Sequence, residues 1–291
     1  MLAPDHEENV ILRRFGLSQA RLIGEGGEAR VFALDENRVL RIARPGASMD
    51  SLRQRQGLAA EIAKSAHHLP FATPHIETVE EVEGRAVAVE RRLAGVPLAH
   101  LFETIEGRQR EAVLTSYLDA SAAIQTIIPD RPYVGELGGG HPVRADSYQQ
   151  YLGKKLEAIR AEAPETFFAA LGPDIVDALP DCDAPALVHF DMFAGNVLIA
   201  DGRVSAVLDF GETTLIADPA LESWSVVAYL DPQISPNARP ADRALAMAWL
   251  ERRGLAAAYP AARRFIAAAW THAHDDPAVM AWCRSILIEG R

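Results

Sequence analysis

Three polar side chains about two thirds of the way along the chain have the types and spacing that a metal-assisted group transfer needs. Asn196 follows Asp191 by five residues, and Asp209 comes thirteen residues after Asn196. A carboxylate placed like that of Asp191 can accept or orient the proton of an attacking hydroxyl, an effect worth roughly 10²–10⁴ in rate. Amide and carboxylate oxygens are hard ligands that suit Mg²⁺. We therefore expect Asp191 to be the base and Asn196 and Asp209 to hold Mg²⁺, the arrangement required for phosphoryl transfer from ATP.

A β-hairpin is expected to bring the two metal ligands together. Residues 197–208 contain two short apolar runs on either side of Asp201-Gly202, a dipeptide typical of a type I′ turn. A regular register puts Asn196 opposite Val207 and diagonal to Asp209. Diagonal neighbours share a face of the sheet and lie about 7–8 Å apart. The amide and carboxylate oxygens are then expected to converge at the open end of the hairpin.

A glycine cluster precedes a strand with one central cation in the first fifth of the chain. Gly24, Gly26 and Gly27 lie between two apolar segments, which predicts two strands joined by a glycine-rich turn. Glycine has no Cβ, so backbone N–H groups there can approach phosphate closely. The next strand, residues 39–42, carries Arg41. Taken alone, a glycine cluster is more often an ordinary turn, and Arg41 could be an exposed strand residue.

With these motifs in place, the chain resembles the aminoglycoside phosphotransferase and choline kinase-like family. The resemblance is carried by HFDMFAGN, residues 189–196, and by VLDFGE, residues 207–212; protein kinases have a related pair of motifs. It implies an α+β, bilobal protein-kinase-like fold, with a small β-rich N-terminal lobe and a larger, mainly helical C-terminal lobe. It assigns the base to Asp191 and the Mg²⁺ ligands to Asn196 and Asp209. His189 lies in the first of these motifs, residues 189–196, which corresponds to the catalytic loop of the family, and we expect its ring to organise that loop.

The resemblance extends to the N-terminal lobe, with two departures. Ala29 stands where the family's third glycine is expected, and Arg41 stands where protein kinases place a phosphate-binding lysine. A helix is predicted over residues 50–68, and Glu61 within it matches the family's glutamate that pairs with the strand cation. We therefore expect an Arg41–Glu61 ion pair.

The lobe boundary is expected near residue 95. Residues 90–98, which include Glu90 and Arg92, resemble the connector between lobes, whose backbone groups would contact the adenine edge. This gives a nucleotide-binding lobe over residues 1–95 and a catalytic and acceptor-binding lobe over residues 96–291. Apolar periodicity in the second lobe predicts helices over 98–105, 107–127, 146–163, 220–231, 240–254 and 260–288. The glycine-rich segment 135–142 is interpreted as a linker, with a place beside the substrate cleft as the alternative.

Acidic residues after the metal aspartate are candidates for the acceptor site. They are Glu212, Glu222, Asp275 and Asp276. The resemblance places the last two near helix ends that shape the acceptor pocket. Asp218 is expected to brace the catalytic loop by hydrogen bonding. His272 and His274 are two residues apart on a predicted helix and point to different faces, which argues against a shared metal.

Composition restricts the partners. A net charge of −11 argues against nucleic acid and is compatible with a cationic acceptor. The longest apolar runs are too short to span a bilayer, and the first ten residues are acidic and polar, unlike a signal peptide. Cys182 and Cys283 provide no disulfide framework, so a cytoplasmic protein without membrane partners is expected.

The leading hypothesis is an ATP- and Mg²⁺-dependent kinase of a small-molecule hydroxyl. Both an aminoglycoside-like antibiotic and an amino-alcohol or sugar metabolite remain open as acceptor. A nucleotide-binding regulatory module without turnover is the alternative, supported by the departures at Ala29 and Arg41. A protein kinase is less favoured, because no Ala-Pro-Glu segment follows Asp209.

Overall fold

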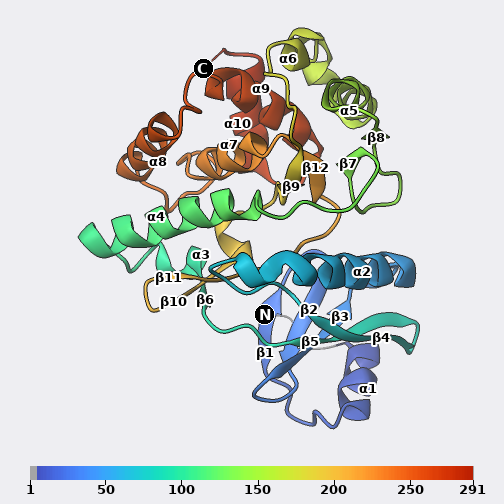
Figure 1. The fold of residues 1–291 in the computed structure, drawn as a ribbon. Helices are drawn as coiled ribbons and strands as arrows, with labels where there is room; N and C mark the ends of the chain where they lie inside the picture. Colours follow the sequence, from blue (N-terminus) through green and yellow to red (C-terminus); the bar gives the residue numbers. More distant parts are fainter. Residues whose placement is uncertain (1–4, 291) are drawn as a thin grey trace.

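The computed structural model describes residues 5–290 and has two lobes, a small one built on a β-sheet and a larger helical one (Figure 1). The sheet has five antiparallel strands in the order β1-β2-β3-β5-β4. Their bounds are β1 Leu22–Glu25, β2 Ala29–Ala33, β3 Arg38–Ala43, β4 Ile76–Val82 and β5 Arg85–Arg91. This architecture confirms the expected α+β, bilobal kinase-like fold.

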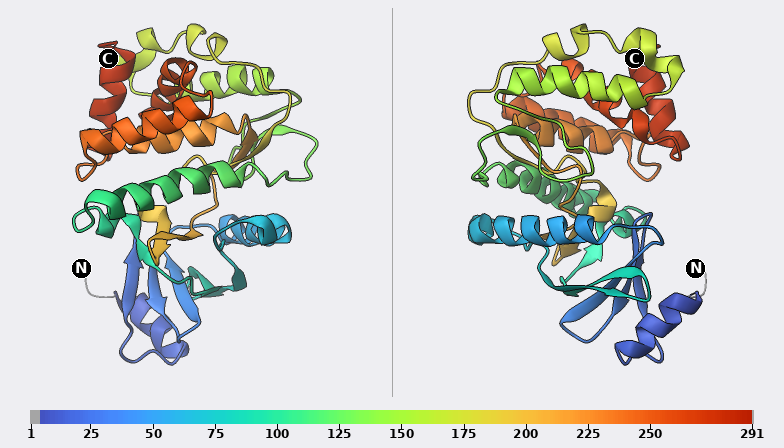
Figure 2. Two further views of the ribbon diagram at one scale, coloured as in Figure 1. Left: turned by 60° about the vertical axis from the view of Figure 1, so that its left-hand side comes forward. Right: turned by 90° about the vertical axis from the view of Figure 1, so that its right-hand side faces the viewer.

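Alternation along the central strands gives the sheet two different faces. On one face, Leu40 packs in the apolar cluster that docks α1 (His6–Arg14). On the other, alanines of β3 and β5 pack against Leu52 of α2 (Met49–Ser65). Arg41 follows Leu40, so its side chain points to the α2 face. In every view α2 lies between the sheet and the helical lobe (Figures 1 and 2), which places the Arg41 face toward the junction of the two lobes.

The helical lobe contains the predicted helices, although the last one is divided. Its helices are α3 Leu98–Leu101, α4 Gly107–Ile124, α5 Tyr148–Glu162, α6 Asp174–Asp177, α7 Ala220–Tyr229, α8 Pro240–Arg252, α9 Tyr259–Ala269 and α10 Pro277–Leu287. Residues 5–290 also contain four 3-10 turns, η1 Ala66–His68 after α2 of the small lobe, and η2 Glu165–Ala170, η3 Ala194–Asn196 and η4 Trp270–His272 in the helical lobe. The predicted continuous helix over 260–288 is wrong. Asp276 caps a new helix by accepting the N–H of Ala278 at 2.9 Å, and Pro277 cannot continue a preceding helix because it lacks an N–H.

The hairpin beside the catalytic loop has the predicted turn. β10 Val197–Ala200 pairs with β11 Arg203–Val207. The two turn residues, Asp201 and Gly202, have φ values of 51° and 72°, which is the backbone of a type I′ turn.

The register of this hairpin differs from the prediction by one residue. A β-bulge separates the Leu198 and Ile199 pairs, so Val207 faces Val197 rather than Asn196. The carbonyl oxygen of Asn196 instead accepts the N–H of Leu208 at 2.8 Å. A bulge adds one residue to one strand, which a regular count of positions does not foresee. Its effect is to put Asn196 level with the residue directly before Asp209.

Two small sheets support the loops of the helical lobe. β6 Val96–Pro97 pairs with β10, giving the order β11-β10-β6. The second sheet has the order β8-β7-β12-β9, with β7 Val134–Glu136, β8 Arg144–Ala145, β9 Ala186–Val188 and β12 Leu215–Ala217. Cys182 and Cys283 are both free thiols. Over residues 5–290, the helices are too short or too polar for any of them to cross a bilayer.

Candidate active site

His189 is the structural centre of the loop that follows β9. Its side chain is fully buried, its Nε2–H donates to the Leu208 carbonyl oxygen at 2.7 Å, and its Nδ1 accepts the N–H of Asp191 at 3.2 Å. Burial lowers the pKa of His189 to about 4, so the ring is neutral at physiological pH. These bonds tie the loop to the hairpin end and agree with the expected organising role.

Glu222 lies beneath the same loop and not in the acceptor pocket. It is fully buried in α7, where its Oε2 accepts the N–H groups of His189 at 2.6 Å and Phe190 at 2.9 Å. Burial raises the pKa of Glu222 to about 7. Phe190 has a φ of 64°, a backbone conformation that is strained for a residue with a side chain. The prediction of Glu222 as an acceptor ligand is wrong, because its carboxylate holds this strained turn.

Asp218 does not brace the catalytic loop as predicted. Its Oδ1 accepts the N–H of Ala220 at 2.9 Å, which caps the start of α7. The bracing expected of Asp218 is provided by Glu222, one helical turn later. Burial raises the pKa of Asp218.

The Asp191 carboxylate is held from both sides. Its Oδ1 accepts the hydroxyl of Tyr229 at 2.9 Å, and its Oδ2 accepts Nδ2 of Asn196 at 3.1 Å. Burial raises the pKa of Asp191 to about 6, although both hydrogen bonds act in the opposite direction. The group is therefore a fixed, ionised acceptor near neutral pH. Tyr229 was not found from the sequence, since nothing in its neighbourhood marks a buried tyrosine in α7.

Asn196 and Asp209 offer a donor set that fits Mg²⁺. Nδ2 of Asn196 is used by Asp191, and within residues 5–290 the amide oxygen has no hydrogen-bond donor. Asp209 has a φ of 66°, and its carboxylate is 31% exposed. Its Oδ1 accepts a charge-assisted hydrogen bond from Nη2 of Arg55 in α2. Two hard oxygen ligands from adjacent ends of one hairpin suit a Mg²⁺ that keeps water and phosphate as its other ligands.

The glycine-rich turn joins β1 to β2 at the edge of the sheet. Gly24 pairs with Val31 in the ladder, and the N–H of Gly26 donates to the Ala29 carbonyl oxygen at 3.0 Å. A Cβ at Gly26 or Gly27 would meet no atom within 4 Å, so internal packing does not require glycine there. Arg44, at the end of β3, holds the turn by donating from Nη2 to the Gly26 carbonyl oxygen at 3.2 Å.

The Arg41–Glu61 pair predicted from the resemblance is wrong. Arg41 Nε instead lies 2.8 Å from Glu90 Oε1. Both residues point to the α2 face of the sheet, because Arg41 pairs with Ala88 and Glu90 lies two residues further along β5. Glu61 points to the helical lobe, where it pairs with Arg131. The position of Glu61 along the predicted helix does not show which face of α2 contacts β3.

The connector begins later than predicted. Glu90 lies within β5, where it is paired on both sides, with Val39 of β3 and with Ile76 of β4. Its backbone is therefore not available to a base edge. The N–H of Arg92 donates to the Asn37 carbonyl oxygen at 2.7 Å. This backbone donor is therefore also not available to a base edge.

A pocket of about 510 Å³ opens at the Asp191 carboxylate. Its acidic lining residues are Asp191, Glu136, Glu162, Glu212 and Asp276, and its aromatic ones are Tyr151, Phe190, Phe193, Tyr229, Phe265 and Trp270. Of the predicted acceptor ligands, Glu212 and Asp276 line it, whereas Asp275 does not. The pocket thus combines a negative wall with an aromatic one.

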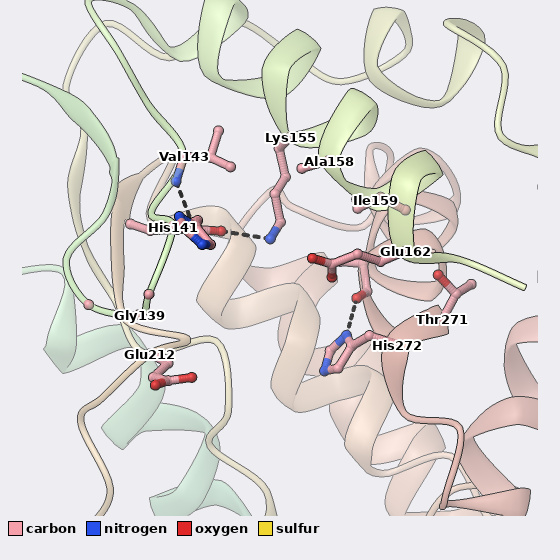
Figure 3. Close-up of a pocket in the computed structure, with 14 residues that line it drawn as sticks. Gly139, His141, Val143, Lys155, Ala158, Ile159, Glu162, Glu212, Thr271 and His272 are labelled. Atoms are coloured by element: carbon pink, nitrogen blue, oxygen red, sulfur yellow. Dashed lines mark hydrogen bonds and ion pairs between the residues drawn. The ribbon is translucent and has the colours of Figure 1, made fainter. Parts of the chain in front are cut away.

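A second cavity of about 320 Å³ shares part of this wall (Figure 3). Gly138 to His141 line it, so the segment interpreted as a linker is a wall of the cavity. Lys155 reaches in from α5, and its Nζ lies 2.6 Å from Glu136 Oε1, which neutralises both groups (Figure 3). In the view of Figure 3, Glu162 and His272 are on one side of the cavity and Glu212 is on the other. Nδ1 of His272 lies 2.7 Å from the Ala269 carbonyl oxygen.

Two lobes with the catalytic loop and the hairpin at their junction define a phosphotransferase of the protein-kinase-like class. The profile of the phosphotransferase enzyme family matches residues 19–265, and the chain belongs to this family. The expectation of a small-molecule kinase is thereby confirmed. A search of curated protein sequences found no match to the chain.

Solved structures with a similar fold include phosphotransferases of antibiotics. The gentamicin complex of APH(2'')-IIa is 15% identical, covers 100% of this chain and 98% of its own, and has a TM-score of 0.65. A thermostable mutant of the aminoglycoside phosphotransferase APH(4)-Ia is 21% identical over 97% of this chain and 99% of its own, with a TM-score of 0.64. The macrolide 2'-phosphotransferase MphH from Brachybacterium faecium is 20% identical over 96% and 98%, with a TM-score of 0.55. At these identities the likeness establishes the fold.

Proposed function

We propose that the protein transfers the γ-phosphoryl group of ATP to a hydroxyl group of a small molecule, with Mg²⁺ as cofactor. The observation that carries the proposal is the position of Asp191. Its carboxylate lies at the wall of the 510 Å³ pocket and is bonded to Asn196, one of the two candidate Mg²⁺ ligands. An acceptor in the pocket and a metal-bound phosphate would therefore meet at one carboxylate.

The nucleotide would bind between the sheet and the helical lobe. A Cβ at Gly26 or Gly27 would lie in open space, so phosphate can approach the turn closely. The Gly26 N–H is used by Ala29, and the backbone N–H of Gly27 is therefore the donor that we propose there. Arg41, oriented by Glu90 at 2.8 Å, would supply a planar donor for the phosphates. We place the boundary between the nucleotide-binding lobe, residues 1–95, and the catalytic lobe, residues 96–291, just before β6, which pairs with β10 of the helical lobe.

Asp191 would align the acceptor hydroxyl and take up its proton. The acceptor oxygen forms a bond to the γ-phosphorus while the bond from that phosphorus to the bridging oxygen of ADP breaks. The proton of the hydroxyl passes to the Asp191 carboxylate, which Tyr229 and Asn196 hold in place. Mg²⁺ bound by Asn196 and Asp209 would neutralise charge on the phosphates. Phosphoryl transfer depends mainly on positioning and charge neutralisation, so a fixed carboxylate is sufficient.

The acceptor is proposed to carry an amine beside the reacting hydroxyl. Glu162, Glu212 and Asp276 line the pocket with negative charge, and Glu136 is neutralised by Lys155. Solved relatives by fold include complexes with gentamicin, streptomycin and kanamycin, which are consistent with such an acceptor. The aromatic wall, where the Tyr229 and Trp270 ring centroids lie 4.4 Å apart, would cover the apolar face of the molecule.

Nucleotide consumption with a panel of hydroxylated acceptors tests this function. The panel holds aminoglycosides, macrolides, amino alcohols and simple sugars, with Mg²⁺ or with a chelator. We expect Mg²⁺-dependent turnover with an amine-bearing acceptor and a loss of at least a hundredfold in Asp191→Ala. Asp201→Asn in the hairpin turn is the matched control, because asparagine tolerates the positive φ of 51° there.

Two results would count against the proposal. Nucleotide binding without turnover of any acceptor would favour the regulatory module, and unchanged turnover in Asp191→Ala would remove Asp191 from the reaction. The charge of the pocket is tested separately with Glu212→Gln, which should raise KM for an amine-bearing acceptor several-fold. Asp275→Asn, outside the lining, should leave KM unchanged.

A further inference from the structure

Arg55 is a cation at the nucleotide site that neither the motifs nor the resemblance indicated. It projects from α2 and its side chain is only 13% exposed. Nη1 donates to Glu28 Oε2 at 3.3 Å, and Nη2 donates to Asp209 Oδ1. One guanidinium therefore joins three elements that surround the proposed phosphate position: α2, the glycine-rich turn and the residue that precedes Phe210-Gly211.

Arg55 contacts two carboxylates, and one of them can be replaced by another anion. Arg41 and Glu90 form their own pair, at 2.8 Å. Arg55 is then shared between two carboxylates, of which Glu28 is 71% exposed and can turn toward water. Asp209 is the partner that a metal ion would also take. A metal ion and a guanidinium on one carboxylate repel each other, so Arg55 needs another anion when the metal binds.

We propose that Arg55 is a further nucleotide-binding residue, which neutralises Asp209 before the metal–nucleotide complex binds and then donates to the phosphate oxygens. The guanidinium is a planar donor suited to phosphate. The guanidinium is largely buried, so water solvates its charge poorly once the metal ion has taken Asp209 as a ligand. The triphosphate supplies the replacement charge at the same place. This inference rests on the proposed function, since it takes the phosphates to lie between the glycine-rich turn and Asp209.

Calorimetric titration of the full chain with ATP and Mg²⁺ tests the proposal without requiring an acceptor. Arg55→Gln removes the charge, and Arg53→Gln is the matched control. Arg53 lies two residues away on the same helix, is 64% exposed and contacts Asp50 at 3.4 Å. We expect Kd for ATP to rise at least tenfold in Arg55→Gln and to stay within twofold in Arg53→Gln. If Arg55→Gln does not fold, Arg55→Met keeps the apolar stem and is expected to give the same increase.

A second titration, with ATP and a chelator, tests the exchange of partners. Asp209→Asn removes the charged partner of Arg55, so the variant protein should bind metal-free ATP more tightly than the wild type. Arg55→Gln should abolish that gain in the double variant. Equal effects of Arg55→Gln in the presence and absence of the Asp209 carboxylate would overturn the exchange.

The outcomes separate this inference from the proposed function. If the wild type binds ATP and both Arg55 variants bind it equally well, Arg55 is a structural partner of Asp209 and the inference is wrong, while the function stands. If the wild type binds no nucleotide, the proposed function and the inference fail together.

Discussion

The hydroxyl of Tyr229 donates a hydrogen bond to Oδ1 of Asp191 at 2.9 Å, across 38 positions of the sequence. The bond joins the buried helix α7 to the catalytic loop, and Asn196 holds the other carboxylate oxygen at 3.1 Å. The orientation of the candidate base is therefore set by two neighbours, of which one is a candidate metal ligand and the other is not. This difference allows the orientation of Asp191 to be tested separately from metal binding.

Tyr229→Phe should slow turnover without weakening the binding of the nucleotide. A hydrogen bond to a charged group is worth about 1.5–3 kcal/mol, so we expect kcat to fall about tenfold or more, with Kd for ATP unchanged. Tyr148→Phe is the control, because Tyr148 is a buried tyrosine whose hydroxyl has no hydrogen-bond partner in the described part of the chain. Steady-state kinetics and calorimetry measure the two quantities. Equal kcat values for the two variants would contradict a positioning role for Tyr229.

Glu90 and Glu61 should differ in their importance for nucleotide binding. Glu90 contacts Arg41 at 2.8 Å, whereas Glu61 pairs with Arg131 at the other side of α2. Glu90→Gln should raise Kd for ATP by about threefold to tenfold, because Arg41 loses the charged partner that orients it. Glu61→Gln should leave Kd within twofold of the wild type. A larger rise in Kd for Glu61→Gln than for Glu90→Gln would instead support the Arg41–Glu61 pair that the family resemblance implied.

Glu222→Gln should change how stability depends on pH. Burial raises the pKa of Glu222 from 4.5 to about 7. Between these values the folded state binds more protons than the unfolded state, so the wild type loses stability as the pH rises from about 4.5 to 7. Glutamine cannot titrate but can still accept the two backbone N–H groups.

Urea unfolding at several pH values measures this effect. The free energy of unfolding of Glu222→Gln, relative to the wild type, should increase from pH 4.5 to 7 and then level off. The total change is on the order of 3 kcal/mol, at about 1.4 kcal/mol for each pKa unit. Parallel curves for the two proteins over this range would contradict the raised pKa.

The buried pair between Arg110 and Asp242 should support the helical lobe. Nε and Nη2 of Arg110 contact the two carboxylate oxygens at 2.8 Å and 2.6 Å, and both side chains are almost fully buried. Arg110→Met leaves Asp242 as a buried, unpaired charge, so we expect a loss of about 3–5 kcal/mol in the free energy of unfolding. Arg108→Met, at an exposed position of the same helix, should change it by less than about 0.5 kcal/mol.

A double-variant cycle identifies the cause of that loss. In Arg110→Met combined with Asp242→Asn, the unpaired charge is also removed. The loss for the double variant should then be smaller than the sum of the two single losses. Additive losses would show that the pair contributes through packing alone.

The sequence by itself determined the features that depend on local pattern. Alternation and the Asp201-Gly202 turn predicted the hairpin, helical periodicity predicted most of the helices, and the spacing of Asp191, Asn196 and Asp209 predicted a single cluster. Residues close together along the chain have few ways to fold, so their types and spacing carry most of this information.

Only the tertiary structure decided which side chains meet between elements far apart along the chain. Glu222 holds the loop of residues 189–196 and does not line the pocket at Asp191, Tyr229 reaches Asp191, and Arg55 rather than Glu61 reaches Asp209. Such contacts depend on the packing angle and rotation of whole helices. These are set by the sum of many small apolar contacts spread over the core, and no single motif encodes that sum.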